Sequence, residues 1–383
     1  MSTSLTSEEL VQLVQRVFRP GPDDRGLALI VDLPDSGLPD HDDWLIRRQL
    51  ASEWAASLAG SAKEAGLDRV TLAWYPNVGG NNADLPPICV PGKPGVRLDH
   101  AGALAGLPTI TFFDLFETHS IILAPTELSA TAPMKVAARR HAMRGATMPG
   151  FLPSMVSALR IDYGEVNRRV DLLKILVDAA DSATVRFRVG KDDHELLLDL
   201  RHRTGHASGG LFPANGVAGN LPSGETYIVP YEGEIAGDPS RTAGTMPVQF
   251  GDEVVVYRIA ENRAVEVLSK GPESRREAAY LRDEPAYANL AELGLGVLGD
   301  FGLQPTGSIL LDEKLGLHIA FGRSDHFGGT VGPADFSSPE AVVHIDRVYI
   351  PEVQPAVHVV SLTMALPDGS REVMRDGQWI GVF

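Results

Sequence analysis

Histidines and carboxylates gather in four short stretches of the second half of this sequence. The stretch around His344 and Asp346 reads as a strand, in which residues two apart point to the same side. These two side chains can therefore face one ion. A second strand-like stretch, residues 317–322, is apolar except for His318.

Two glutamates in the same half extend this set of polar side chains. Glu225 ends a Pro-Ser-Gly turn where a strand begins, and Glu292 stands among leucines. A carboxylate buried among leucines should be paired or bound to a metal, because burying a free charge is costly. Each residue alone has an ordinary structural explanation, as a turn residue, a surface residue or a satisfied core residue. Together they are a ligand set that Zn²⁺, Co²⁺, Mn²⁺ or Fe²⁺ accepts.

The size of the ligand set bears on the chemistry. Two histidines with three or more carboxylates are enough to hold two adjacent divalent ions. Two such ions can activate one bridging water and polarise a carbonyl together. The residue types therefore predict a metal-dependent enzyme.

The first half of the chain alternates apolar strands with amphipathic helices. Residues 26–33 are a continuous apolar run, typical of a buried parallel strand. Residues 41–65 have helical spacing, and further strands are expected at 70–75, within 107–116 and at 120–124. This alternation predicts an open α/β domain over residues 1–180. It contains neither a GxGxxG fingerprint nor a P-loop, so its glycines are interpreted as turns.

Beyond about residue 180 the pattern becomes that of short antiparallel strands. Residues 184–189 and 195–200 read as a hairpin joined across 190–193, and more strands are expected at 227–230, 253–259 and 263–268. Residues 181–383 are therefore predicted to form a mainly antiparallel, barrel-like domain that binds the metal and carries out catalysis.

Composition excludes several classes of protein. Among 383 residues the net charge is −16, which disfavours nucleic acid and anionic membranes as partners. The single cysteine, Cys89, excludes an internal disulfide and a thiolate zinc cluster. No apolar run approaches the roughly 18–20 residues of a membrane span, and the N-terminal residues do not resemble a signal peptide. We expect a soluble, cytoplasmic protein.

The four motifs, taken in order, resemble those of a known family. Pro-Ser-Gly-Glu, Glu-Leu-Gly-Leu-Gly, Asp-Glu-Lys…His-Ile-Ala-Phe-Gly and His-Ile-Asp are similar to motifs of the aminopeptidase T (M29) family of dinuclear metallopeptidases. The resemblance covers roughly residues 215–350. It implies a homodimer that removes N-terminal residues from peptides with two divalent ions, typically cobalt, zinc or manganese. The metal ligands that it implies are Glu225, Glu292, His318, His344 and Asp346.

One loop departs from the pattern of this family. Where the family has a tyrosine ligand, seven residues after His318, this sequence has Asp325 followed by His326. Either side chain could take the place of the tyrosine at the metal, and His326 could instead act as a general base. Glu313 could lie beside the metal ligands or serve as a general base, although a turn residue is an equally good explanation.

A second activity is associated with the same fold. Related dihydroxypyridine ring-cleaving dioxygenases use one Fe²⁺ held by two histidines and a carboxylate. In them the position matching Glu292 is a histidine, and the position matching Glu225 is not acidic. Because this sequence has both glutamates, we expect a hydrolase acting on a peptide. The alternatives are the Fe²⁺ dioxygenase, another metal-dependent enzyme on a small polar molecule, and a metal-dependent binding module.

Overall fold

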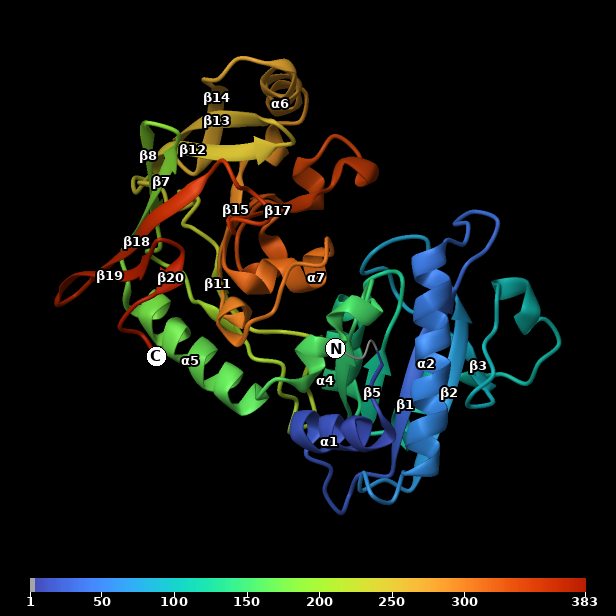
Figure 1. Cartoon of the computed structure of the whole chain (residues 1–383). Helices are drawn as coiled ribbons and strands as arrows, with labels where there is room; N and C mark the ends of the chain where they lie inside the picture. Colours follow the sequence, from blue (N-terminus) through green and yellow to red (C-terminus); the bar gives the residue numbers. More distant parts are fainter. Residues whose placement is uncertain (1–3) are drawn as a thin grey trace. The chain divides into compact units, whose positions relative to one another are not determined.

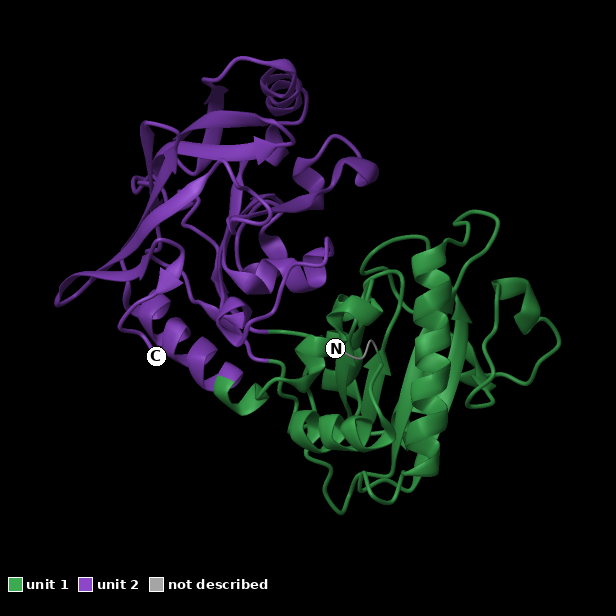
Figure 2. Ribbon diagram, in the orientation of Figure 1, with its two compact units in different colours: residues 1–165, 210–223 green, residues 166–209, 224–383 purple. Residues whose placement is uncertain are grey.

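The computed structural model describes residues 4–383 and divides the chain into two compact units (Figure 2). Unit 1 holds the chain up to residue 165 together with 210–223, and unit 2 holds 166–209 and 224–383. The sequence predicted one boundary at residue 180, whereas the structure divides the chain after residue 165 and assigns residues 210–223 to unit 1. Most of helix α5 (Tyr163–Ala179) belongs to unit 2, where Thr226 Oγ1 donates a hydrogen bond to the carbonyl of Val170 (2.6 Å).

Unit 1 is the α/β part of the chain (Figure 1). Its sheet has the order β10-β6-β5-β1-β2-β3-β4, and strands β10, β6, β5, β1 and β2 are parallel. The strands are β1 (Gly26–Leu33), β2 (Arg69–Pro76), β3 (Ile88–Gly92), β4 (Ile110–Thr111), β5 (Ile121–Ala124), β6 (Arg144–Thr147) and β10 (Ala218–Asn220). The helices are α1 (Ser7–Phe18), α2 (Asp42–Gly60), α3 (Phe112–Thr118) and α4 (Thr131–Arg140), with short 3₁₀ helices η1 (Ala101–Leu104) and η2 (Pro153–Arg160). The predicted α/β architecture is confirmed.

Local sequence accounts for these elements. Strand β1 is buried along its whole length, as its continuous apolar run requires. Thr6 caps α1, where its side chain accepts a hydrogen bond from the backbone N–H of Glu9. The strand expected within residues 107–116 spans only two residues. Thr111 ends it because its hydroxyl accepts from the N–H of Asp114 (2.9 Å) and begins helix α3.

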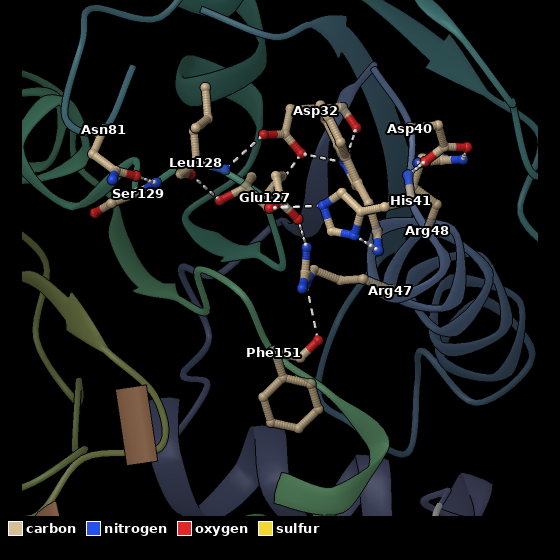
Figure 3. Close-up of polar contacts among 12 residues, drawn as sticks. Asp32, Asp40, His41, Arg47, Arg48, Asn81, Glu127, Leu128, Ser129 and Phe151 are labelled. Atoms are coloured by element: carbon tan, nitrogen blue, oxygen red, sulfur yellow. Dashed lines mark hydrogen bonds and ion pairs between the residues drawn. The ribbon is translucent and has the colours of Figure 1, made fainter. Parts of the chain in front are cut away.

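A buried carboxylate links β1 to the loop that follows β5 (Figure 3). The side chain of Asp32 accepts hydrogen bonds from the backbone N–H groups of Glu127 (2.8 Å) and Leu128 (3.0 Å) and from Nε1 of Trp44 (3.2 Å). Glu127 in turn is paired with Arg47 on helix α2 and with His41, the residue that caps this helix. Burial raises the pKa of Asp32 to about 6, against the lowering effect of the backbone hydrogen bonds.

Unit 2 contains two antiparallel sheets. The five-stranded sheet has the order β17 (His344–Val348), β16 (Leu317–Gly322), β15 (Leu290–Gly296), β11 (Glu225–Ile228) and β9 (His206–Ser208). The eight-stranded sheet has the order β14 (Arg263–Val267), β13 (Glu253–Ala260), β12 (Ala243–Phe250), β8 (Asp192–Asp199), β7 (Ser182–Val189), β18 (His358–Leu366), β19 (Gly369–Arg375) and β20 (Gln378–Trp379). The mainly antiparallel character expected from the sequence is confirmed.

Short helices connect these strands. They are α6 (Pro272–Asp283), α7 (Ile309–Asp312), η3 (Pro285–Ala288), η4 (Leu298–Phe301), η5 (Glu313–Leu315), η6 (Asp325–Phe327), η7 (Pro333–Asp335) and η8 (Pro339–Ala341). Strands β7 and β8 form the expected hairpin, which turns at Gly190 with a positive φ of 60°. Within residues 4–383, no helix is long and apolar enough to cross a membrane.

Candidate metal centre

The five-stranded sheet brings the predicted ligands onto one face. Asp346 on β17 and Glu292 on β15 both lie opposite Ala320 on the strand between them, β16. Directly opposed residues share a face of a sheet, so the two carboxylates flank a side chain of a single methyl group. The small side chain leaves room above the middle strand for whatever the carboxylates bind.

Glycine makes room for the next row of side chains. His318 lies opposite Gly294, and a Cβ atom at position 294 would meet Nε2 of His318 at 1.8 Å. Gly296 lies opposite Glu225, and a Cβ atom there would meet the backbone of Lys314 at 2.3 Å. In the Glu-Leu-Gly-Leu-Gly motif, the glutamate and the two glycines lie on the same face of β15, because side chains alternate along a strand. The glutamate is a candidate ligand, and each glycine leaves space for a neighbouring group.

One group of ligand atoms comprises Glu225, Glu292 and His318. Nε2 of His318 lies 3.2 Å from Oε1 of Glu292 and 3.6 Å from Oε2 of Glu225. Oε2 of Glu225 is buried and has no hydrogen-bond partner among the described residues. A buried carboxylate oxygen without a donor is costly unless a cation meets it, so this group fits a divalent ion. Nδ1 of His318 also lacks a partner among those residues, whereas Nε2 can donate a hydrogen bond to Oε1 of Glu292.

A second group comprises Glu292, His344 and Asp346. Nε2 of His344 lies 3.2 Å from Oε2 of Glu292 and 3.4 Å from Oδ1 of Asp346. Nδ1 of His344 lies 2.8 Å from the carbonyl oxygen of Arg323, to which it can donate. That hydrogen bond leaves Nε2 as the nitrogen available to a metal, which is how metal-binding histidines are commonly oriented.

Glu292 belongs to both groups and offers a different oxygen to each. In each group the ligand atoms lie within 4.8 Å of one another. A carboxylate that presents one oxygen to each of two donor groups has the geometry of a bridging ligand between two ions. We define the Glu225 subsite as Glu225, Glu292 and His318, and the Asp346 subsite as Glu292, His344 and Asp346.

The charges of these residues are strongly coupled. Burial opposes ionisation of Glu292, but its contacts with His318 and His344 outweigh burial and lower its pKa to about 2. Burial alone would lower the pKa of His318, yet the hydrogen bond and charge of Glu292 raise it to about 9. The carboxylates thus hold protons on the histidines where a metal would otherwise bind. A metal ion must displace those protons.

Glu313 and Lys314 lie beside the Glu225 subsite. Nζ of Lys314 is 2.5 Å from Oε1 of Glu225 and also contacts Glu313. Burial raises the pKa of Glu313 to about 8, with Lys314 acting in the opposite direction and Glu225 reinforcing the shift. The predicted general base is thus adjacent to a metal subsite, although its carboxylate is paired with a lysine.

In the loop that departs from the family pattern, Asp325 and His326 lie in different surroundings. Asp325 is outside both subsites and is paired with Arg323 at 2.6 Å. The ring of His326 lies 5.4 Å from the ring of His344, edge to face, and packs on Phe327. Burial, reinforced by the charge of His344, lowers the pKa of His326 to about 4. Of the two residues, His326 is the one that lies against a subsite.

Two residues beside the centre were not anticipated from the sequence. Tyr227 lies opposite Gly294, on the same face of β11 as Glu225, and its ring packs against Phe327. The alternation Glu225-x-Tyr227 was a signal available in the sequence, because it places the phenol on the ligand face of the sheet.

Glu232 was also missed. Its carboxylate accepts hydrogen bonds from Ser324 Oγ (2.5 Å), Thr330 N–H (2.5 Å) and Asn289 Nδ2 (2.9 Å). It therefore holds both ends of the loop that carries His326. Nothing in the local sequence around Glu232 marks it, because its partners are distant in the chain.

Comparison with known proteins relates this fold to two enzymes. The 2,5-dihydroxypyridine dioxygenase from Pseudomonas putida KT2440 is 14% identical, with a TM-score of 0.62 over 98% of this chain and 98% of that chain. AmpT from Thermus thermophilus, an aminopeptidase T, is 16% identical, with a TM-score of 0.53 over 97% of this chain and 99% of that chain. The chain shares the fold of both enzymes.

The similarity of this chain to known proteins is found in its structure and not in its sequence. No protein-family model and no curated protein sequence matches the chain. The predicted relation to aminopeptidase T is confirmed by structure, and so is the relation to the dioxygenases. At such low sequence identities the likeness establishes a common fold and not a common activity. Both similar proteins are enzymes, in agreement with the expectation of an enzyme.

Proposed function

We propose that the chain is a metal-dependent hydrolase that removes N-terminal residues from peptides. The observation that supports this most strongly is the shared ligand Glu292, whose two oxygens face separate donor groups. Such a pair of subsites suits two divalent ions, which supply Lewis acidity and an activated water for carbonyl hydrolysis. The preference for peptides rests on the motif resemblance and on the fold shared with AmpT.

Different residues would bind the ions, transfer the proton and contact the substrate at such a centre. Glu225, Glu292, His318, His344 and Asp346 would hold the ions. Glu313 would accept or deliver a proton at the Glu225 subsite, because its carboxylate lies beside that subsite and contacts Lys314. His326 and Tyr227 would border the space over the ligand face and contact the substrate. We expect the protein to act as a cytoplasmic homodimer.

The test begins with metal-free protein reconstituted with Zn²⁺, Co²⁺ or Mn²⁺. Hydrolysis is then measured on a panel of dipeptides and on the same dipeptides with an acetylated N-terminus. We expect hydrolysis only of peptides with a free amino group, and none in the Glu225→Gln or Glu292→Gln variants. Full activity in both variants would refute the two-ion centre.

One observation favours a second candidate function. Lys314 already neutralises one oxygen of Glu225, which would leave the Asp346 subsite and His318 to hold a single ion. A single Fe²⁺ held in this way would suit the ring cleavage by O₂ that the motif resemblance implies, and the similar structure is also a dihydroxypyridine dioxygenase. One iron per chain together with oxygen consumption on a dihydroxylated pyridine would establish this alternative, and peptide hydrolysis would exclude it.

A further inference from the structure

Lys314 places a buried positive charge beside one of the two metal subsites. Its side chain is only 2% exposed, and Nζ contacts Oε1 of Glu225 at 2.5 Å. The other oxygen of that carboxylate, Oε2, faces His318 at 3.6 Å. Glu225 therefore stands between an ammonium group and the space where an ion would bind. Among the described residues, no lysine or arginine contacts the ligand atoms of Asp346, on which the charge of Lys314 acts only from a longer distance.

The charges of the centre show what this ammonium does. With neutral histidines, the three ligand carboxylates of Glu225, Glu292 and Asp346 carry a charge of −3, and Lys314 reduces the sum to −2. One divalent ion would leave this sum at zero, and a second ion would take it to +2. Without the lysine charge, two divalent ions would leave the sum at +1. Because Coulomb repulsion falls with distance, the ammonium opposes the ion that Glu225 meets more than an ion at the Asp346 subsite.

We propose that Lys314 makes the two subsites unequal. The Asp346 subsite binds its ion tightly, whereas the Glu225 subsite binds a weak, exchangeable ion. Lys314 acts as a positioning residue: it orients Glu225 through Oε1, and its charge lowers the affinity of the ion that Oε2 meets. The inference rests on the two-subsite arrangement of the proposed function. It predicts that protein purified without added metal holds mainly one ion per chain and gains the second from solution.

Calorimetric titration of the metal-free protein with Co²⁺ tests this inference, with the visible Co²⁺ absorption followed for each equivalent. In the parent protein we expect one tight equivalent and a second that is at least about tenfold weaker. Lys314→Met should tighten the second equivalent by about tenfold or more and leave the first nearly unchanged. Lys314→Arg keeps the charge and should retain the unequal pattern. One equivalent in the parent and two in Lys314→Met is the limiting form of the expected result.

Two further variants assign the subsites. Glu225→Gln should remove the weak equivalent and its absorption band, and Asp346→Asn should remove the tight one. The inference is overturned by two equal equivalents in the parent, by an unchanged or weaker second equivalent in Lys314→Met, or by loss of the tight equivalent in Glu225→Gln. These readouts need no substrate, so absence of peptide hydrolysis would refute the proposed function and leave this result intact.

Removal of Lys314 leaves two buried carboxylates without their partner, and the Lys314→Met variant could fail to fold without metal. The variant Lys314→Gln also removes the positive charge but keeps an amide that can donate a hydrogen bond to one of these carboxylates. Its circular dichroism spectrum and melting curve confirm the fold before titration. If the second Co²⁺ still binds as weakly in the folded Lys314→Gln variant as in the parent, Lys314 does not set the inequality.

Discussion

Gly294 on β15 lies directly opposite His318 on β16, and the imidazole of His318 occupies the space that a side chain at position 294 would fill. The atom that a Cβ at position 294 would meet is Nε2, the nitrogen that faces Glu292. Gly294 has no positive φ, so alanine fits its backbone. A methyl group here would displace the end of a side chain and not the backbone.

The first prediction is that Gly294→Ala loses metal and keeps the fold. Displacing the ring of His318 removes a ligand atom from the Glu225 subsite, whereas the strand pairing is untouched. In protein equilibrated with Co²⁺, we expect elemental analysis to show loss of the Glu225-subsite ion, together with loss of hydrolysis and a melting temperature within a few degrees of the parent. Metal content equal to that of the parent would contradict this interpretation of Gly294.

The second prediction concerns Gly296, two residues along the same strand. A Cβ atom there would meet the carbonyl carbon of Lys314 at 2.3 Å and the carbonyl oxygen of Glu313 at 2.8 Å, and backbone cannot swing aside. We expect Gly296→Ala to lower the free energy of unfolding by about 3 kcal/mol, as overpacking in a core does. Urea denaturation measures the loss, with Gly294→Ala as the matched control. Equal stability of the two variants would refute the prediction.

The third prediction concerns the pH dependence of Asp32. Its pKa is raised from 3.8 in the reference state to about 6 by burial, so the folded state binds its proton more tightly than the unfolded state. The stabilisation from this proton is therefore complete below about pH 4 and is lost as the pH rises through 6, a change of about 3 kcal/mol. Asp32→Asn lacks this contribution, so its deficit in unfolding free energy should be larger at pH 4 than at pH 7.

Urea denaturation of both proteins at pH 4, 5.5 and 7 measures this change in deficit. Asp35→Asn is the matched control. Backbone hydrogen bonds from Leu38 and Gly37 lower the pKa of the exposed Asp35. The deficit in unfolding free energy of Asp35→Asn should therefore be larger at pH 7 than at pH 4. A deficit for Asp32→Asn that grows between pH 4 and pH 7 would show that burial does not dominate at Asp32.

The fourth prediction concerns Glu232, which holds the loop over residues 324–330. Glu232→Gln replaces one accepting oxygen by a donor and breaks the hydrogen bonds to Thr330. Hydrogen exchange of the loop should accelerate at least about tenfold, because a lost charged hydrogen bond costs about 1.5–3 kcal/mol. Glu234→Gln is the control, since Glu234 pairs with Arg203 and, among the described residues, makes no hydrogen bond or ion pair with the loop. Equal protection of the loop in both variants would show that Glu232 does not hold it.

The fifth prediction concerns His326, whose ring lies against His344. If it contacts the substrate or moves a proton, His326→Ala should lower turnover by on the order of a hundredfold. His194→Ala, on the eight-stranded sheet, is the control for loss of a partly buried histidine. Steady-state kinetics at matched metal content gives the comparison. Turnover equal to that of the parent would mean that the loop is structural.

The sequence by itself determined the fold class and the chemical character of the centre. Alternation of apolar runs and helical spacing predicted the α/β sheet, because buried parallel strands and amphipathic helices have distinct periodicities. The spacing of His344 and Asp346 placed both on one side of a strand, since side chains alternate with a period of two. These are local properties, which a single segment expresses without its neighbours.

Tertiary structure decided how those residues meet. Glu292 faces two donor groups only because the register of β15 with β16 and of β16 with β17 sets which residues oppose each other. Lys314 reaches Glu225, 89 positions away, through the packing of a short 3₁₀ helix over Gly296. Asp325 is paired with Arg323, whereas His326 lies at the subsite, because a loop held by Glu232 sets their directions. Such contacts join segments far apart in the chain, so no local pattern of residues encodes them.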